Sequence, residues 1–425
     1  MIGNQMENDT GKLNPGARTR DERLAALEKI KELTAIGKLK APEQNGCVCN
    51  HIHTFYSFSP WSPAEAVLMS WQNRLAAAGL MDHDTIAGAD EFIEAGKILG
   101  MPTTIGCECR VDMSKTRLAG RRFNDPDQTS IAYAAMHGIP RDKLPELDRF
   151  FSPLRKLRCE RSALMCERLT SLTKPLGITI DFERDVLPLS HESEGGSVTE
   201  RHIVFALTKK LTERFKAPAE LVGVLENRLG APIPEKLRER LLSGDDAEFR
   251  EYDILCALKS GFVERFYIPA GAECPDVSEF IGICREVGAV SAYAYLGDVS
   301  GSATDDKKPQ KYEDGCLAEL FPELKRLGFD AVTYMPNRNS KEQLERVSAL
   351  CREYGFLEIS GEDINSPRQP FLSPTMTDPE LGYLTDSAFA LIEHERLGGG
   401  ILTGRADIRQ KAAELAREFR KRNSL

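Results

Sequence analysis

The sequence lacks several features that would place it in a specialised class of protein. No apolar stretch reaches the ~18 residues that a membrane-spanning helix needs, so we expect no membrane span. The polar first residues contain no apolar signal core. The 11 cysteines are too sparse in 425 residues for a disulfide scaffold, and no Cys-x-x-Cys pair occurs. We therefore expect a cytoplasmic protein with reduced thiols.

Positive charge is also scarce. The chain has 56 Lys and Arg against 65 Asp and Glu, a formal net charge of −9. Because a nucleic-acid polymer needs a basic surface, we do not expect one as a partner, although a local basic pocket for a small anion fits this balance. The 41% of hydrophobic and 28% of charged residues are typical of a globular protein, and a homo-oligomer is compatible with them.

Strand-like and helix-like segments alternate in two parts of the chain, which indicates a parallel α/β arrangement. Together the two parts have about the size of a βα barrel, commonly some 250 residues. The expected strands lie within 46–54, 75–85, 103–113, 288–298, 329–336 and 355–365. We predict an N-terminal arm and helix (1–45), the first part of a barrel (46–115), a mostly helical insertion (116–270), the second part of the barrel (271–370) and a helical tail (371–425).

Histidines and carboxylates gather where these strands end. His51 and His53 are two residues apart, so both face the same side of a strand. Other strands carry Asp82-His83-Asp84, Glu108, and Asp363 with Asn365. In a βα barrel the carboxyl ends of the strands meet at one mouth, and this mixture of N and O ligands suits Zn, Mn or Fe.

Each of these pieces has a plainer explanation when taken alone. An H-x-H pair is often incidental, Asp82-His83-Asp84 fits a polar loop, Glu108 fits a buried paired carboxylate, and Asp363 fits a turn. The joint placement at successive strand ends favours a metal site.

The order of these motifs resembles a known family. His51-x-His53-Thr54, Asp82-His83-Asp84-Thr85, Gly106-x-Glu108 and Gly361-x-Asp363-x-Asn365 are similar to motifs of the PHP (polymerase and histidinol phosphatase) superfamily. Its members are metal-dependent phosphoesterases. The resemblance covers about 46–113 and 275–366, and Thr199-Glu-Arg-His-Ile-Val extends it weakly. It implies a distorted seven-stranded βα (TIM-like) barrel, here with a large, mostly helical insertion.

The resemblance also implies roles for individual residues. His51, His53, Glu108 and Asp363 match a first metal site, with Glu108 as the residue that bridges two metals. The metal ligands implied are His51, His53, His83, Glu108, His137, His202, Asp363 and Asn365. Because hydrolysis of a phosphate ester needs cations that neutralise the phosphate oxygens, the candidate phosphate contacts are Arg110, Arg201 and Arg338, with Lys307, Lys308 and Arg368 as further cations. Asp82 and Tyr295 would support the ligands or the substrate without forming the first site. For Arg338, Lys307, Lys308 and Arg368, a solvated loop charge is the plainer explanation.

Three positions depart from the family pattern. Asn365 replaces a usual ligand histidine, Ser59 replaces an Asp or His, and Tyr295 replaces the His of a His-Pro pair. The first site keeps its full ligand set, so we expect one divalent metal ion there and incomplete ligand sets at a second and a third site. An amide oxygen at position 365 can still coordinate a metal, but less tightly than imidazole.

Two further expectations concern the rest of the chain. His191 and His394 are predicted to be surface residues. The insertion either caps the barrel mouth as a lid that selects the substrate or forms a dimerisation surface.

The function implied is hydrolysis of a phosphate ester of a small metabolite or nucleotide by a metal-activated water. The alternative is a degenerate PHP protein that binds metal or a phosphorylated ligand without turnover. An exonuclease is disfavoured by the acidic balance.

Overall fold

One seven-stranded sheet forms the centre of the protein. The computed structural model describes residues 19–125, 127–231, 233–244, 247–298 and 312–424. The strands follow one another around the sheet in chain order. They are β1 (Val48–Ile52), β2 (Ala77–His83), β3 (Thr103–Asp112), β4 (Ile131–His137), β5 (Val290–Tyr295), β6 (Ala331–Tyr334) and β7 (Leu357–Ser360). The interiors of the strands are mostly apolar and buried. This is typical of parallel strands, because both faces of such a sheet are covered.

The segment after β7 returns to β1 and nearly closes the sheet into a barrel. The main-chain N–H of His53 donates to the carbonyl of Ile364 at 2.9 Å, and the N–H of Ile364 donates to the carbonyl of His51 at 2.9 Å. We refer to these two bonds as the closing seam. The fold is therefore a TIM-like α/β barrel with a helical insertion, which confirms the fold class predicted from the sequence.

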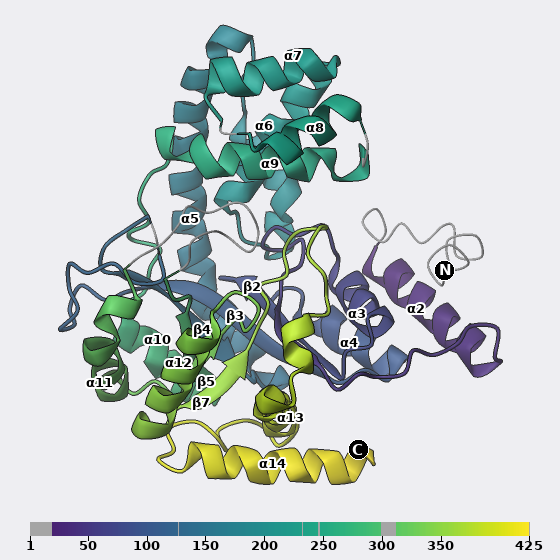
Figure 1. Ribbon diagram of the computed structural model, residues 1–425, viewed down its shortest axis with the longest axis vertical. Coiled ribbons are helices and arrows are strands. Elements are labelled where there is room, and N and C mark those ends of the chain that lie inside the picture. The colour runs from purple at the N-terminus through teal and green to yellow at the C-terminus, as the bar shows by residue number, and fades with distance from the viewer. Residues whose placement is uncertain (1–18, 126, 232, 245–246, 299–311, 425) are drawn as a thin grey trace.

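Helices surround the barrel on all sides (Figure 1). The insertion forms a separate helical body above the mouth, and the last two helices lie across the opposite end. The barrel and the insertion each have a hydrophobic core of their own. The α-helices are α2 (Arg20–Ala35), α3 (Pro63–Gln72), α4 (Ala89–Leu99), α5 (Leu144–Thr173), α6 (Glu200–Arg214), α7 (Pro218–Gly223), α8 (Glu235–Ser243), α9 (Arg250–Gly261), α10 (Val277–Val287), α11 (Leu317–Leu327), α12 (Lys341–Tyr354), α13 (Gly382–Arg396) and α14 (Ile408–Asn423).

Local sequence signals set the ends of the outer helices. Helix α12 begins at Ser340, whose side chain and that of Gln343 form a capping box. It ends at Gly355, whose φ of +73° is in the left-handed region that glycine adopts without strain. Among the described residues, no helix is both long and apolar enough to cross a membrane.

Strand β4 differs from the sequence prediction. It falls within 116–270, which the periodicity assigned to the helical insertion, yet it belongs to the barrel sheet. It pairs antiparallel with both β3 and β5, whereas the other neighbouring strands are parallel. An antiparallel neighbour needs no crossover helix, so the strand–helix alternation that marked the other strands is absent here.

His394 also differs from its prediction as a surface residue. It is fully buried in α13, and its Nε2 lies 2.7 Å from the carbonyl oxygen of Gly288. The reason is that α13 packs against β1, β3 and β7 and covers the end of the barrel opposite the mouth.

Candidate metal centre

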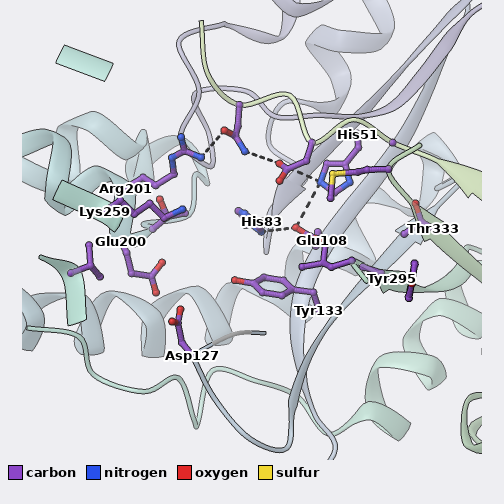
Figure 2. A pocket seen from close by; sticks show the side chains of 18 of the residues that line it. His51, His83, Glu108, Asp127, Tyr133, Glu200, Arg201, Lys259, Tyr295 and Thr333 are labelled. Atoms are coloured by element: carbon purple, nitrogen blue, oxygen red, sulfur yellow. Dashed lines mark hydrogen bonds and ion pairs between the residues drawn. The ribbon is translucent and has the colours of Figure 1, made fainter. Parts of the chain in front are cut away.

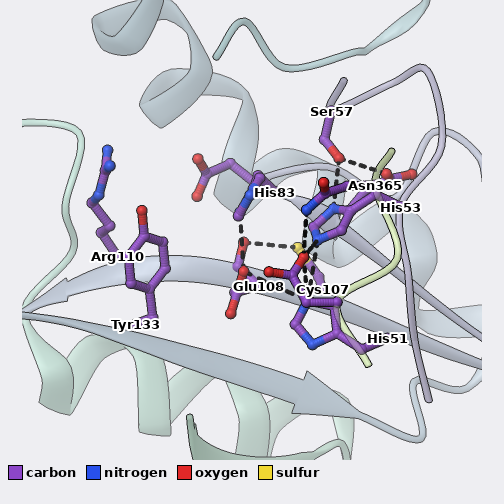
Figure 3. Close-up of polar contacts among 12 residues, drawn as sticks. His51, His53, Ser57, His83, Cys107, Glu108, Arg110, Tyr133 and Asn365 are labelled. Carbon is purple, nitrogen blue, oxygen red and sulfur yellow. Dashed lines mark hydrogen bonds and ion pairs between the residues drawn. The ribbon is translucent and has the colours of Figure 1, made fainter. Parts of the chain in front are cut away.

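Four predicted ligand side chains meet at the mouth of the barrel (Figure 3). The ligand atoms of His51, His53 and Glu108 all lie within 4.8 Å of one another. Nε2 of His51 is 3.1 Å from Nε2 of His53 and 3.8 Å from Oε2 of Glu108. Oδ1 of Asp363 is 3.1 Å from Nε2 of His53. We call these four residues the donor cluster.

The chemistry of the donor cluster fits a divalent cation. Two imidazole nitrogens and two carboxylates converge from the end of β1, from β3 and from the segment after β7. Nitrogen and oxygen donors in this mixture suit Zn, Mn or Fe. Burial lowers the pKa of His53, but the hydrogen bond and the charge of Asp363 outweigh it, so the pKa is raised. The carboxylates of Asp363 and Glu108 therefore place negative charge beside this ring, as a cation site requires.

A hydrogen-bonded chain behind His53 fixes which ring nitrogen faces the cluster. Oδ1 of Asp82 accepts a hydrogen bond from the main-chain N–H of Thr54 at 2.7 Å. The same oxygen accepts a second hydrogen bond from the Ser57 hydroxyl at 2.6 Å. Having donated its own hydrogen, the Ser57 oxygen accepts from Nδ1–H of His53 at 3.1 Å. In the neutral ring of His53 the lone pair is thereby left on Nε2, the nitrogen that lies 3.1 Å from Nε2 of His51 and 3.1 Å from Oδ1 of Asp363. Asp82, predicted to orient a ligand, reaches His53 through Ser57.

His83 lies on the other side of Glu108. Its Nδ1 is 3.2 Å from Oε2 of Glu108, and its ring centroid is 4.7 Å from that of His53. Burial, together with the charges of His53 and Arg158, lowers the pKa of His83 well below its ordinary value. Nδ1 of His83 therefore faces the Glu108 carboxylate.

Asn365 faces Arg201 and Asp363. Its amide oxygen accepts from the Arg201 guanidinium at 2.6 Å, and its amide nitrogen donates to Oδ1 of Asp363 at 2.7 Å. The amide oxygen of Asn365, which was predicted to coordinate a metal, thus faces the guanidinium of Arg201.

Arg110, predicted to contact phosphate, lies in a buried ion network. It donates to Asp125 at 3.1 Å and to Glu200 at 3.3 Å, and its guanidinium lies 5.1 Å from the centre of the Tyr133 ring. Burial raises the pKa of Glu200, but Arg110 and Arg161 lower it by more, so this carboxylate carries a charge. The charge of Arg110 is therefore balanced within the protein.

Two predicted ligand histidines lie outside the donor cluster. His137 ends β4 and pairs with Val290, the first residue of β5, because β4 runs antiparallel; it therefore lies below the mouth. His202 is in α6, where its Nδ1 accepts from the Thr199 N–H at 3.0 Å and its ring packs edge-on against Phe58. Burial is the main cause that lowers the pKa of each histidine to about 3.

The other predicted residues are turned elsewhere. The Tyr295 hydroxyl donates to Asp314 at 2.5 Å, although its ring lines the pocket described next. Arg338 lies in the turn after β6 and does not line that pocket. Arg368 pairs with Asp253 at 2.6 Å. Lys307 and Lys308 lie outside the described residues.

A pocket of about 310 Å³ opens onto the donor cluster (Figure 2). Barrel residues form its inner end, and the insertion forms its outer wall. The insertion residues on that wall include Arg158, Thr199, Glu200, Arg201, Lys259 and Tyr267. The insertion thus supplies part of the wall of the pocket at the mouth.

Sequence reasoning did not find Arg158, Lys259 and Tyr267 as pocket residues. They come from α5, from the end of α9 and from the loop after it. Charged residues at helical spacing are common on solvated faces, so no local signal distinguished Arg158 and Lys259 from their neighbours. Tyr267 lies in a loop, where no strand or helix periodicity marks it.

Comparisons with known proteins bear on the fold. No family model and no curated protein matches the sequence. A structure described as a "putative metal-dependent phosphoesterase" from Bifidobacterium adolescentis is 21% identical with a TM-score of 0.52, over 80% of this chain and 95% of that one. An amidohydrolase from Chromobacterium violaceum, with bound sulfate and no metal, is 16% identical with a TM-score of 0.50, over 77% and 92%. At these identities the likeness shows the barrel fold alone.

Proposed function

We propose that this protein is a metal-dependent phosphoesterase of the PHP type, acting on a phosphate ester of a small metabolite or nucleotide. The observation that carries the proposal is the donor cluster, His51, His53, Glu108 and Asp363, at the inner end of a pocket with cationic side chains on its outer wall. Hydrolysis of a phosphate ester needs an activated water molecule and positive charge beside the phosphate oxygens. The metal ligands suit the first requirement, and the positively charged wall suits the second.

The residues of the chain have separate parts in this reaction. A divalent cation at the donor cluster would supply a water of lowered pKa as the nucleophile. His53 presents Nε2 because Ser57 holds its Nδ1–H, and His83 holds Glu108 in place. Arg201 and Lys259, on the pocket wall, would attract the phosphate and offset its charge.

The size and cover of the pocket support a small substrate. Its volume of about 310 Å³ is at the lower end of the range for small-molecule sites. The insertion lies over the mouth, so a folded polymer would meet it before reaching the donor cluster. A sulfate, which is a tetrahedral anion like phosphate, binds to one of the fold neighbours.

The test is hydrolysis of a panel of phosphomonoesters and phosphodiesters with Mn²⁺ or Zn²⁺ added. Glu108→Gln should lower both bound metal and turnover, by about a hundredfold or more for a direct ligand. Glu353→Gln, at an exposed position of α12, is the matched control and should leave both unchanged. Failure of every substrate, or turnover unaffected by Glu108→Gln, would refute the proposal.

A second candidate function is binding of a phosphorylated ligand without turnover. Its support is that the polar groups at two of the replaced positions are hydrogen-bonded within the protein: the oxygen of Asn365 accepts from Arg201, and the hydroxyl of Tyr295 donates to Asp314. This function predicts that the protein binds Mn²⁺ and inorganic phosphate together but hydrolyses none of the panel.

A further inference from the structure

A chain of two hydrogen bonds connects the helical insertion to the donor cluster. Arg201, in the first turn of α6, donates to Oδ1 of Asn365 at 2.6 Å, and Nδ2 of Asn365 donates to Oδ1 of Asp363 at 2.7 Å. A guanidinium can only donate, so the amide oxygen must face Arg201 and the amide nitrogen must face Asp363. Arg201 therefore fixes the amide in the one orientation that holds the carboxylate.

Asp363 needs such support because of its backbone. Its φ is +47°, in the left-handed region that residues with a side chain seldom occupy. Such a conformation costs on the order of 1 kcal/mol and persists where neighbours enforce it. Gln369 braces the same turn, donating to the Asp363 carbonyl at 2.9 Å and accepting from the Asn365 N–H at 2.8 Å. The Asn365 amide donates to the carboxylate itself, which also lies 3.1 Å from Nε2 of His53.

The position of Arg201 is set from the barrel side as well. Its guanidinium lies 5.3 Å from the centre of the Phe58 ring. Phe58 comes from the loop after His53, yet it belongs to the hydrophobic core of the insertion, where its ring centroid is 5.5 Å from that of Phe205. The insertion, the loop after β1 and the turn after β7 are thus packed together around Arg201.

We infer that Arg201 is a positioning residue that holds Asp363 through Asn365, so that the helical insertion sets the metal affinity of the donor cluster. The inference rests on the metal binding contained in the proposed function. It gives Arg201 a role in addition to the attraction of phosphate proposed above, and it gives Asn365 a role other than metal ligand.

The sign of the effect separates this role from simple charge. A cation near a metal site repels the metal, so its removal should tighten metal binding if charge alone matters. A positioning role predicts the opposite, because an unheld carboxylate must be ordered again when metal binds.

The experiment is calorimetric titration of Mn²⁺ alone into metal-free protein. The variants are Arg201→Met, which keeps a long side chain without donors, Asn365→Leu, and the double variant. The matched control is Arg265→Met, because Arg265 is another insertion arginine, placed 5.1 Å from the centre of a Phe262 ring and bonded to the Leu229 carbonyl. Thermal unfolding without metal shows that each variant is folded.

We expect each single variant to weaken Mn²⁺ binding about tenfold to a hundredfold, the range for residues that orient ligands. The double variant should bind no more weakly than Asn365→Leu, because both residues act through one chain. The control should bind like wild type. Unchanged or tighter binding by Arg201→Met, or additive losses in the double variant, would overturn the inference alone. Absence of Mn²⁺ binding by the wild type would overturn the proposed function with it.

Discussion

Replacing Ser57 by alanine should weaken metal binding by an amount that can be worked out from the structure. The hydroxyl accepts from Nδ1–H of His53 at 3.1 Å and donates to Asp82 at 2.6 Å. Both partners are at most 1% exposed, so water cannot replace the lost bonds without rearrangement. Losing one neutral and one charge-assisted bond should lower the free energy of unfolding by about 2 kcal/mol.

The second effect of Ser57→Ala is on the metal. Without the hydroxyl, His53 is free to rotate or to carry its proton on Nε2, and metal affinity should fall about tenfold to a hundredfold. A metal at a thousand times its Kd stabilises the fold by about 4.1 kcal/mol, and at a hundred times by about 2.7 kcal/mol. A tenfold loss of affinity therefore removes about 1.4 kcal/mol of metal-dependent stability.

Urea unfolding with and without Mn²⁺, at one fixed free concentration, measures both effects in one experiment. Ser70→Ala is the matched control, because Ser70 is also buried but donates to a carbonyl within α3. It should lose stability without losing the increment that Mn²⁺ adds. If Ser57→Ala kept that increment in full, the hydroxyl would not orient His53.

Three further perturbations have directions set by the structure. Arg158→Met should lower the free energy of unfolding in urea by about 3–5 kcal/mol, because it leaves the Asp84 carboxylate buried without its partner. Burial raises the pKa of Glu395 to about 8, so the folded state keeps a proton that the unfolded state releases above pH 4.5. The free energy of unfolding should therefore fall as the pH rises from 4.5 toward 8. Glu395→Gln should remove that fall from the measured pH dependence of unfolding. Gly361→Ala should weaken Mn²⁺ binding in calorimetry at least about tenfold, because its Cβ would lie 2.5 Å from Cβ of His51.

Each of these three has a clear contradicting result. Arg158→Met with wild-type stability would mean that water solvates the carboxylate. An unchanged pH slope in Glu395→Gln would assign the titration to another group. Wild-type Mn²⁺ affinity in Gly361→Ala would mean that the turn moves and His51 does not.

The parts of the site that were predictable depend on strand periodicity. His51 and His53 lie two residues apart at the end of a strand, and Glu108 and Asp363 follow from the meeting of strand ends at one mouth. The same regularity predicted the barrel. It did not predict β4, whose antiparallel pairing removes the helix that would have marked it.

The remaining parts depend on contacts between distant segments. Asn365 and Arg201 are 164 residues apart, and nothing near either one shows that the amide oxygen faces a guanidinium. The sequence around His394 predicted an exposed position. The strands that bury this residue are distant from it along the chain, so its own helix gives no sign of them. Pairings of this kind are set by tertiary packing, which a single sequence does not display.

The closing seam of the barrel has a consequence for its dynamics. The amides of His53 and Ile364 bond across it, and the side chains of His53 and Asp363 extend from the same two segments into the donor cluster. A cation shared by those side chains would act as a cross-link between the first and last strands, which are otherwise joined by the two seam bonds and by the bond from the Asn50 amide to the Ser360 carbonyl. Hydrogen–deuterium exchange measures this effect without any substrate. If the metal cross-links the two strands, the amides of His53 and Ile364 should exchange more slowly when Mn²⁺ is added.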